Sequence, residues 1–142
     1  MSFDFAINNG DLVIGTSGDL KQITGQNKLI QDIMKICLTP AGANIFQPYY
    51  GSFINKVLIG NVLDTDITVS MAQNQLQNAL ENLKKLQQLQ LSDTLQQVDP
   101  SEHLAGITSI TIERNKIDPR LFTVSIKVLS RAFQRSNVSF TV

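Results

Sequence analysis

The chain begins with two short apolar runs, at residues 3–7 and 12–14, and the residues between them are polar and predict a turn. The turn contains Asn9 and Gly10, and an Asn-Gly pair tolerates positive φ angles at both central positions of a tight hairpin turn. The pattern therefore predicts an N-terminal β-hairpin. Residues 19–23, which lie just before a glycine, predict a further short strand.

Residues 26–38 follow the spacing of a helix rather than that of a strand. Their apolar side chains form two adjacent i, i+4 rows: Leu29, Ile33 and Cys37 in one, and Ile30, Met34 and Leu38 in the other. Since the rows together make a wide apolar arc, we expect this helix to be buried on more than one side. Thr24 is a candidate N-cap. Pro40 ends the helix, because a proline pushes the preceding residue out of the α region.

The segment after this helix holds residues that impose particular backbone geometry. We expect residues 45–49 to be extended, although Pro48 excludes a central strand position. A short helix should follow from Ser52. We interpret the loop as a rigid brace between helix and sheet. Its structural residues are Thr39, Gly42, Pro48, Tyr50 and Gly51.

The longest helical pattern covers residues 66–91, with Asp64 or Thr65 as its N-cap. Its apolar positions alternate in spacing as in a coiled-coil seam: Val69, Ala72, Leu76, Ala79, Leu83 and Leu86. The opposite face is mostly amide: Gln73, Asn74, Gln75, Gln77, Asn78, Gln87 and Gln88. The pattern fits two arrangements, a core helix packed on the sheet or a helix whose seam partly meets a partner helix.

The rest of the chain reads as a linker followed by strands. Residues 92–106 have the composition of a linker, and strands are predicted at residues 107–114, 122–130 and 138–142. The inward-facing residues of the last two strands are predicted to be Phe122, Val124, Ile126, Val128, Val138, Phe140 and Val142. Residues 1–142 thus predict a single α+β domain. It should contain a small mixed or antiparallel sheet with an N-terminal hairpin, packed against two to three helices including one long helix.

Composition argues against several classes of protein. Hydrophobic residues make up 42% of the chain and charged residues 17%, with 12 basic against 12 acidic side chains. No basic field favours nucleic acid. No apolar stretch approaches the roughly 20 residues needed to span a bilayer, and the first residues lack the features of a secretory signal. We expect neither a nucleic-acid nor a membrane partner.

The residues that most enzymes use are scarce. His103 is the single histidine and Cys37 the single cysteine, so a zinc site of the usual type cannot form. We expect Cys37 to be a buried small hydrophobe and His103 a solvated loop residue. Glu81, Glu102 and Glu113 are the only glutamates, and we expect them to be surface carboxylates. The sequence predicts no enzyme activity, no metal and no cofactor.

Roughly the first third of the chain contains a series of spaced motif residues: Gly18-Asp19-Leu20, Gly25, Leu29, Gln31-Asp32, Leu38-Thr39, Gly42, Pro48 and Tyr50-Gly51-Ser52. This series resembles the baseplate wedge and sheath-initiator proteins of contractile phage tails and related injection machines. Some relatives in that family are labelled lysozyme-like.

The chain also departs from the family pattern. Relatives usually carry Glu-Pro-Arg between the long helix and the sheet, where this chain has Asp99, Pro100 and Ser101. The acid and the proline persist in kind as structural residues, but the arginine is absent. Where relatives have Gly-Glu, this chain has Gly42 and Ala43.

The resemblance implies a structural component of a virion tail baseplate, assembled in the host cytoplasm in a six-fold arrangement. Such a protein joins the wedge to the first sheath ring and templates sheath assembly by β-strand addition. The implied partners are the tail sheath subunit and the baseplate wedge subunits, with tail tube or hub proteins as further candidates.

On this hypothesis the sheet of residues 107–142 receives strands from the sheath, since backbone hydrogen bonds give strength and alternate side chains give register. The residues assigned to sheath binding are Val124, Ile126, Val138, Phe140 and Val142, and those assigned to wedge binding are Leu76, Leu83 and Leu86. The last strand could instead only complete its own sheet. Two other functions stay open: a tail-associated peptidoglycan hydrolase, and an α+β binding module outside any tail.

Overall fold

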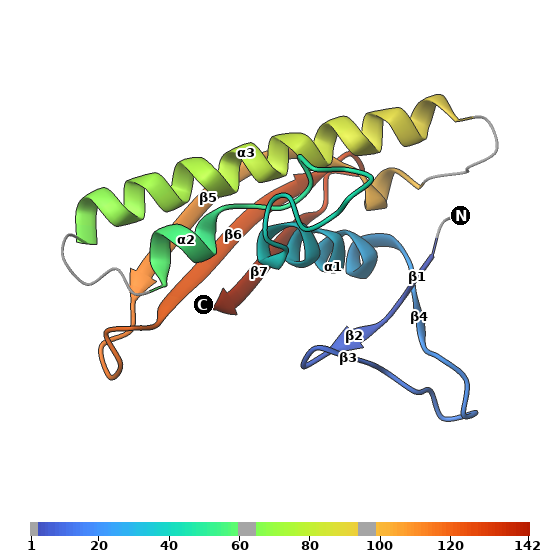
Figure 1. Ribbon diagram of the computed structural model, residues 1–142. Coiled ribbons are helices and arrows are strands. Elements are labelled where there is room, and N and C mark those ends of the chain that lie inside the picture. The colour runs from blue at the N-terminus through green and yellow to red at the C-terminus, as the bar shows by residue number, and fades with distance from the viewer. Residues whose placement is uncertain (1–2, 60–64, 94–98) are drawn as a thin grey trace.

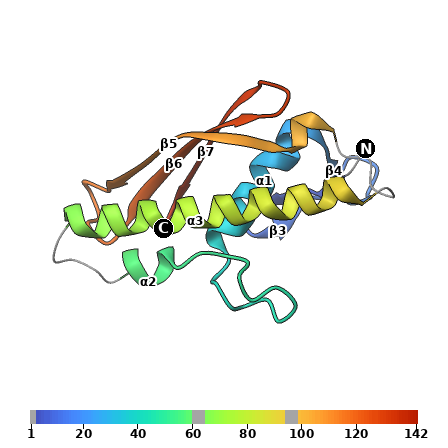
Figure 2. The ribbon, with the colours of Figure 1, turned by 90° about the horizontal axis from the view of Figure 1, so that it is seen from above.

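A computed structural model describes residues 3–59, 65–93 and 99–142 of the chain. An antiparallel sheet lies under two helices, α1 and α3, and a small N-terminal β arm projects from this body (Figure 1). Turned by 90°, the sheet lies behind the long helix α3, and α2 lies on the side of α3 away from the sheet (Figure 2). The predicted α+β class, with its N-terminal hairpin and one long helix, is confirmed.

The N-terminal arm contains four short strands: β1 (Asp4–Phe5), β2 (Ile7–Asn8), β3 (Asp11–Leu12) and β4 (Gln22–Ile23). The predicted hairpin is present as the antiparallel pair β2 and β3. Asn9 and Gly10 form its turn with φ angles of 52° and 81°, as the tight turn requires. The strand expected over residues 19–23 is shorter than predicted, because only β4 forms a ladder, with β1, while Leu20 makes an isolated bridge with Ile14.

The arm is attached to α1 through polar side chains. The Gln31 amide donates from Nε2 to the carbonyl of Phe5 over 2.8 Å and accepts at Oε1 from the N–H of Ile7 over 2.9 Å. Lys35 also pairs with the carboxylate of Asp4. The large apolar side chains of the arm are exposed: Phe3, Phe5, Ile7, Leu12, Ile14 and Leu20.

Helix α1 (Gly25–Leu38) is the central core helix, in agreement with its wide apolar arc. Leu29, Ile33, Ile36 and Cys37 are at most 1% exposed. Burial raises the pKa of the Cys37 thiol to about 12, and the prediction of a buried small hydrophobe is confirmed. The helix ends at Leu38, as the following proline predicts.

Gly51 closes the loop that follows α1. Its φ is 114°, and a Cβ atom at this position would lie 2.5 Å from the carbonyl oxygen of Thr39. The same carbonyl accepts from the N–H of Ser52 over 2.9 Å, while the Ser52 hydroxyl donates to the carbonyl of Cys37 over 2.5 Å. The base of the loop is therefore fixed to the end of α1.

The middle of this loop differs from the prediction. Residues 45–49 form bends and turns rather than an extended segment. Pro48 lies in a turn closed by the N–H of Tyr50 donating to the carbonyl of Gln47 over 3.0 Å, and proline suits the second position of such a turn. Gly42 adopts a positive φ of 85°. The loop leads into the short helix α2 (Ile54–Leu58), so it joins two helices rather than a helix and the sheet.

Helix α3 (Thr65–Ser92) packs its apolar stripe against α1, α2 and the sheet. Within this stripe the buried residues are Ala72, Leu76, Ala79, Leu80 and Leu83. Leu76 and Leu83 are 0% and 6% exposed, so they belong to the core and cannot meet a wedge subunit while the fold holds. This corrects their assignment to partner binding; of the three leucines assigned to it, Leu86 is the most accessible, and it is half-buried.

The amide face of α3 is not entirely solvated. Gln87 is 5% exposed; it donates from Nε2 to the carbonyl of Glu102 over 3.0 Å and accepts at Oε1 from the N–H of Leu104 over 2.8 Å. Gln73 donates to the carbonyl of Ile110 over 3.1 Å. These two amides join α3 to the segment entering the sheet and to the sheet itself.

The linker residues Asp99 and Pro100 begin the 3₁₀ helix η1 (Pro100–Glu102). The Asp99 carboxylate accepts from the N–H of Ser101 over 3.0 Å, and Pro100 occupies the first helical position, where proline is favoured. This turn directs Glu102 and His103 inward, where they are 1% and 2% exposed. The expectations of a surface carboxylate and a solvated histidine at these positions were wrong.

The main sheet contains β5 (Leu104–Arg114), β6 (Phe122–Ser130) and β7 (Arg135–Thr141), in the order β5-β6-β7 and antiparallel throughout. The alternating pattern of residues 122–130 gives β6 with the predicted bounds. The β5–β6 register shifts twice, between Leu104 and Gly106 and between Ile107 and Ser109, whereas the β6–β7 register has no shift.

Candidate functional site

The residues assigned to strand addition divide between a central strand and an edge strand. Val124 and Ile126 lie on β6, whose backbone pairs with both neighbours. They are fully buried and cannot pair with an added strand, which corrects their assignment. Val138 and Phe140 lie on the edge strand β7 with their side chains in the core. Val142 follows β7 and is half-buried.

The register of β7 shows which of its backbone groups point away from the sheet. Phe122 and Val142 exchange two hydrogen bonds, of 2.9 and 2.8 Å. Residue pairs across two antiparallel strands alternate between pairs joined by backbone hydrogen bonds and pairs that are not. Phe140 and Val138, two and four residues before Val142, therefore also direct their N–H and C=O groups toward β6. The intervening residues therefore direct theirs outward: Arg135, Asn137, Ser139 and Thr141.

One end of this outer edge is already occupied by α1. The Gln26 amide donates to the carbonyl of Arg135 over 2.9 Å and to the hydroxyl of Ser136 over 2.8 Å. Among the described residues, no hydrogen bond meets the outward backbone groups of Asn137, Ser139 or Thr141. All three residues are exposed, so this stretch of β7 is an accessible, unpaired sheet edge.

The opposite edge, on β5, is partly covered by α3. By the same alternation, Ile110 and Ile112 direct their backbone groups away from β6. Gln73 of α3 occupies the carbonyl of Ile110, and Ile112 is 6% exposed. The two register shifts also make β5 irregular, a feature that protects sheet edges from pairing. The sheet therefore offers one regular edge, that of β7, within the described part of the chain.

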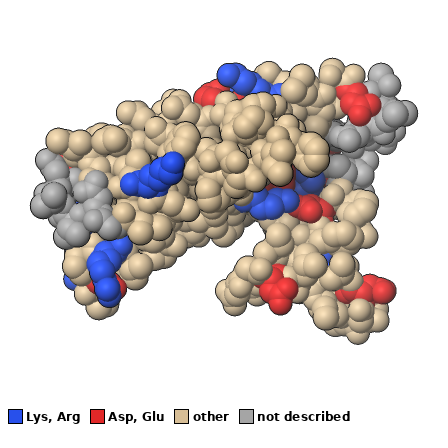
Figure 3. Space-filling model, viewed as in Figure 1, with Lys and Arg blue, Asp and Glu red and all other residues tan. Residues whose placement is uncertain are grey.

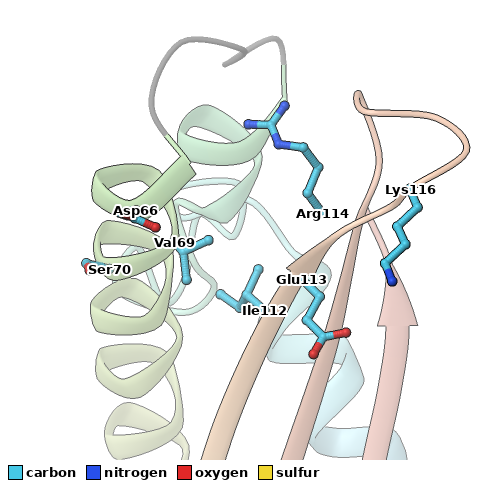
Figure 4. A pocket seen from close by; sticks show the side chains of 7 residues that line it. All are labelled: Asp66, Val69, Ser70, Ile112, Glu113, Arg114 and Lys116. Atoms are coloured by element: carbon cyan, nitrogen blue, oxygen red, sulfur yellow. The ribbon is translucent and has the colours of Figure 1, made fainter.

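A separate hollow of about 680 Å³ lies between the start of α3 and the end of β5 (Figure 4). It is lined by Asp66, Val69, Ser70, Ile112, Glu113, Arg114 and Lys116. Val69 and Ile112 point into it from facing elements, whereas Glu113 alternates with Ile112 and turns away from α3. Asp66 and Glu113 thus do not face one another across the hollow as a pair of catalytic carboxylates would.

The buried pair formed by Glu102 and His103 is also separated from solvent. Burial lowers the pKa of His103, and Arg131 lowers it further, whereas Glu102 raises it. Glu102 accepts from the N–H of Gly25 over 3.2 Å. This pair joins the linker to α1 and is not accessible to a substrate.

Within residues 3–59, 65–93 and 99–142, no cluster of His, Cys, Asp and Glu side chains is arranged to hold a metal ion. No helix in the same residues has both the length and the apolar character required to cross a bilayer.

The sequence left open which edge of the sheet is free, and the residues that it assigned to strand addition are not those whose backbone is accessible. It chose the inward-facing apolar positions, since alternation indicates which side chains reach the core. The accessible backbone belongs to the polar residues between them: Asn137, Ser139 and Thr141. The polar positions of the same alternating pattern were the sequence signal that could have identified these residues.

Comparison with known proteins identifies the fold. No family model matches the chain, and no curated protein matches it. Among solved structures, the chain is similar to a "putative tail lysozyme" from Geobacter sulfurreducens, with a TM-score of 0.61 and 14% sequence identity. The match covers 93% of this chain and 95% of that chain. The two proteins share a fold over nearly their whole lengths.

Proposed function

We propose that this protein is a structural component of a contractile tail baseplate, which joins the wedge to the first sheath ring by accepting a β-strand. Three observations support the proposal. The motif series between Gly18 and Ser52 resembles the wedge and sheath-initiator family. The fold is similar to that of a protein described as a "putative tail lysozyme". The main sheet has an exposed, unpaired edge.

The edge of β7 is the observation that carries the proposal. An exposed row of backbone N–H and C=O groups is a template for another strand, which natural proteins usually cover or interrupt. Here β5 is partly covered by α3 and interrupted by two register shifts, whereas β7 is neither over Asn137, Ser139 and Thr141. A protein that functions by strand addition needs one such edge.

The wedge contact belongs, in this proposal, to the C-terminal end of α3. This end extends past the sheet (Figure 1). Leu86 is half-buried there, while Leu89 and Leu91 are 64% and 45% exposed. A partner helix could cover these side chains without disturbing the core, unlike a contact through Leu83.

The test is to purify the tagged protein from contractile tail particles and to identify the bound proteins by mass spectrometry. Recovery of both sheath and wedge subunits is the expected result. A protein that co-purifies with neither would overturn the proposal. The Leu89→Asp variant, whose side chain is exposed, should retain the sheath subunit and lose the wedge subunits.

A hydrolase function makes a different prediction. Purified protein would clear cell-wall peptidoglycan with turnover, and one carboxylate-to-amide substitution would abolish that activity. Glu113→Gln and Asp66→Asn are the two substitutions to compare, because both residues line the hollow beside α3. We expect no clearing by the unmodified protein.

A further inference from the structure

Phe133, in the turn between β6 and β7, has a backbone angle that its side chain disfavours. Its φ is 60°, and in the described part of the chain only Asn9 shares a positive φ among residues other than glycine. Asparagine tolerates this region, whereas a bulky residue there is an outlier. The Ser130 carbonyl accepts from the N–H of Phe133 over 3.0 Å, so the turn itself holds the residue in this conformation.

The fold makes little use of the Phe133 side chain, which is 84% exposed. Glycine would adopt the same φ without strain. Strained residues of this kind gather at functional sites, and aromatic side chains are enriched at protein interfaces. A strained and exposed aromatic residue therefore indicates a contact outside its own fold.

Three cations surround this turn. Arg131 and Arg135 are exposed on either side of Phe133. Arg135 lies opposite Leu129 on β6, and Lys127 follows two residues away on the same face of that strand. Within the part of the chain that the structure describes, none of the three cations is in an ion pair. The turn, residues 131–135, thus fits an apolar surface that carries carboxylates.

The N-terminal arm has an apolar face. Ile7 pairs with Leu12, and Ile14 pairs with Leu20. Side chains of paired residues, and of residues two apart on one strand, point to the same face. That face therefore carries large apolar side chains that are 39–68% exposed: Phe5, Ile7, Leu12, Ile14 and Leu20.

The arm also carries carboxylates that its own chain does not neutralise. Asp4 is in an ion pair with α1, and Ala6 is buried, so the opposite face is turned to the body. Asp11 and Asp19 are exposed beside the two turns of the arm, and neither is in an ion pair among the described residues. They outnumber the arm's single cation, Lys21. The space-filling view shows the arm projecting from the body with acidic side chains on it (Figure 3).

Other exposed apolar side chains match a basic turn less well. The loop after α1 exposes Phe46, but residues 39–59 contain no acidic residue. The connection between β5 and β6 exposes Ile117, but its carboxylate, Asp118, is already in an ion pair. The arm combines an apolar face with carboxylates that have no cation beside them.

We infer that the β6–β7 turn of one copy of this chain docks on the N-terminal arm of a second copy. Phe133 packs on the apolar face of the arm, and the two flanking arginines approach Asp11 and Asp19. The contact joins two different patches, so it repeats from copy to copy and builds a ring or an open chain. It does not depend on the proposed baseplate function.

Sedimentation of the purified protein over a series of concentrations tests this contact. The unmodified protein should self-associate as its concentration rises, and should pass beyond a dimer, because each copy keeps one free turn or one free arm. A monomer at every concentration up to about 1 mM would overturn the inference. A complex that stops at the dimer would also overturn it, because that result indicates one patch paired with itself.

An exchange of charges identifies the two surfaces. One variant combines Arg131→Glu and Arg135→Glu, and the other combines Asp11→Lys and Asp19→Lys. Each alone should associate at least about tenfold more weakly, because like charges then face one another. A mixture should associate again, through the acidic turn of one variant and the basic arm of the other. Unchanged association of either variant, or no recovery in the mixture, would overturn the inference; circular dichroism checks that both fold.

The aromatic side chain has its own test. Phe133→Gly should weaken self-association at least about tenfold, because a buried phenylalanine is lost from the contact. Its melting temperature should not fall, since glycine relieves the strained φ. Phe46→Gly is the matched control, because Phe46 is 94% exposed on the loop after α1, and it should associate like the unmodified protein. Equal association of the two glycine variants would overturn the role of Phe133.

Discussion

The carboxylate oxygen Oε1 of Glu102 accepts a hydrogen bond of 3.2 Å from the backbone N–H of Gly25, the first residue of α1, across 77 positions of sequence. Glu102 is 1% exposed. It supplies an acceptor to the first N–H of the helix, while the side chain of Thr24 at the N-cap makes no capping bond. A carboxylate at this end of a helix is also favoured by the helix dipole.

Replacing Glu102 by alanine should lower the free energy of unfolding by about 1–3 kcal/mol, because the partly buried N–H of Gly25 loses its acceptor. Glu102→Gln keeps an acceptor and should cost less. Thr24→Ala is the control and should change stability by less than about 0.5 kcal/mol. Urea denaturation followed by circular dichroism measures all three, and equal losses at positions 24 and 102 would contradict this account.

Gly51→Ala should destabilise the protein more than Gly42→Ala. Both glycines have positive φ angles, which cost a residue with a Cβ about 1–2 kcal/mol. Only at Gly51 would the Cβ also collide with backbone, at 2.5 Å from the carbonyl oxygen of Thr39; at Gly42 nothing lies within 4 Å. The difference between the two melting temperatures measures the collision, and similar temperatures would argue against a rigid loop base.

Leu83→Asp should unfold the isolated protein, since a charge placed at a core position that is 6% exposed costs several kcal/mol. Leu89→Asp, at 64% exposure on the same helix, should leave the fold intact. Circular dichroism of the two purified variants distinguishes them. A folded Leu83→Asp monomer would show that the fold does not require an apolar side chain at this position of α3.

Stability should decrease as the pH falls below about 6.5, the pKa of an ordinary histidine, because His103 stays neutral in the folded state while the unfolded chain gains a proton. The depressed pKa has its cause in burial and in the neighbouring Arg131, which outweigh the opposing effect of Glu102. Denaturation midpoints at pH values on both sides of this range measure the effect. In His103→Leu this part of the pH dependence should disappear, and its persistence would assign it to other groups.

The sequence predicted the elements whose side chains alternate or repeat regularly. The alternation in residues 122–130 gave β6 its bounds, and the apolar rows gave α1 and α3. Asn9 and Gly10 identified the hairpin turn through the backbone angles that they permit.

The burial of several polar residues and the identity of the open sheet edge depend on tertiary contacts, which the local sequence pattern does not reveal. Glu102 and His103 lie in a polar segment that reads as solvated, yet the turn begun by Asp99 directs both into the core. Gln87 lies among exposed amides and is buried because two backbone groups of the linker need partners. The identity of the open edge depended on strand order and register, which involve residues distant in sequence.

The bond between Gln26 and Ser136 also bears on the order of folding, because these two residues are 110 positions apart. The strands β5, β6 and β7 can pair through short connections, whereas docking of α1 beside β7 closes a loop that spans most of the chain. Such long loops close late, since their entropy cost precedes any gain from contacts. The chain should therefore expose a bare β7 edge early, and α1 should dock beside β7 only near the end of folding.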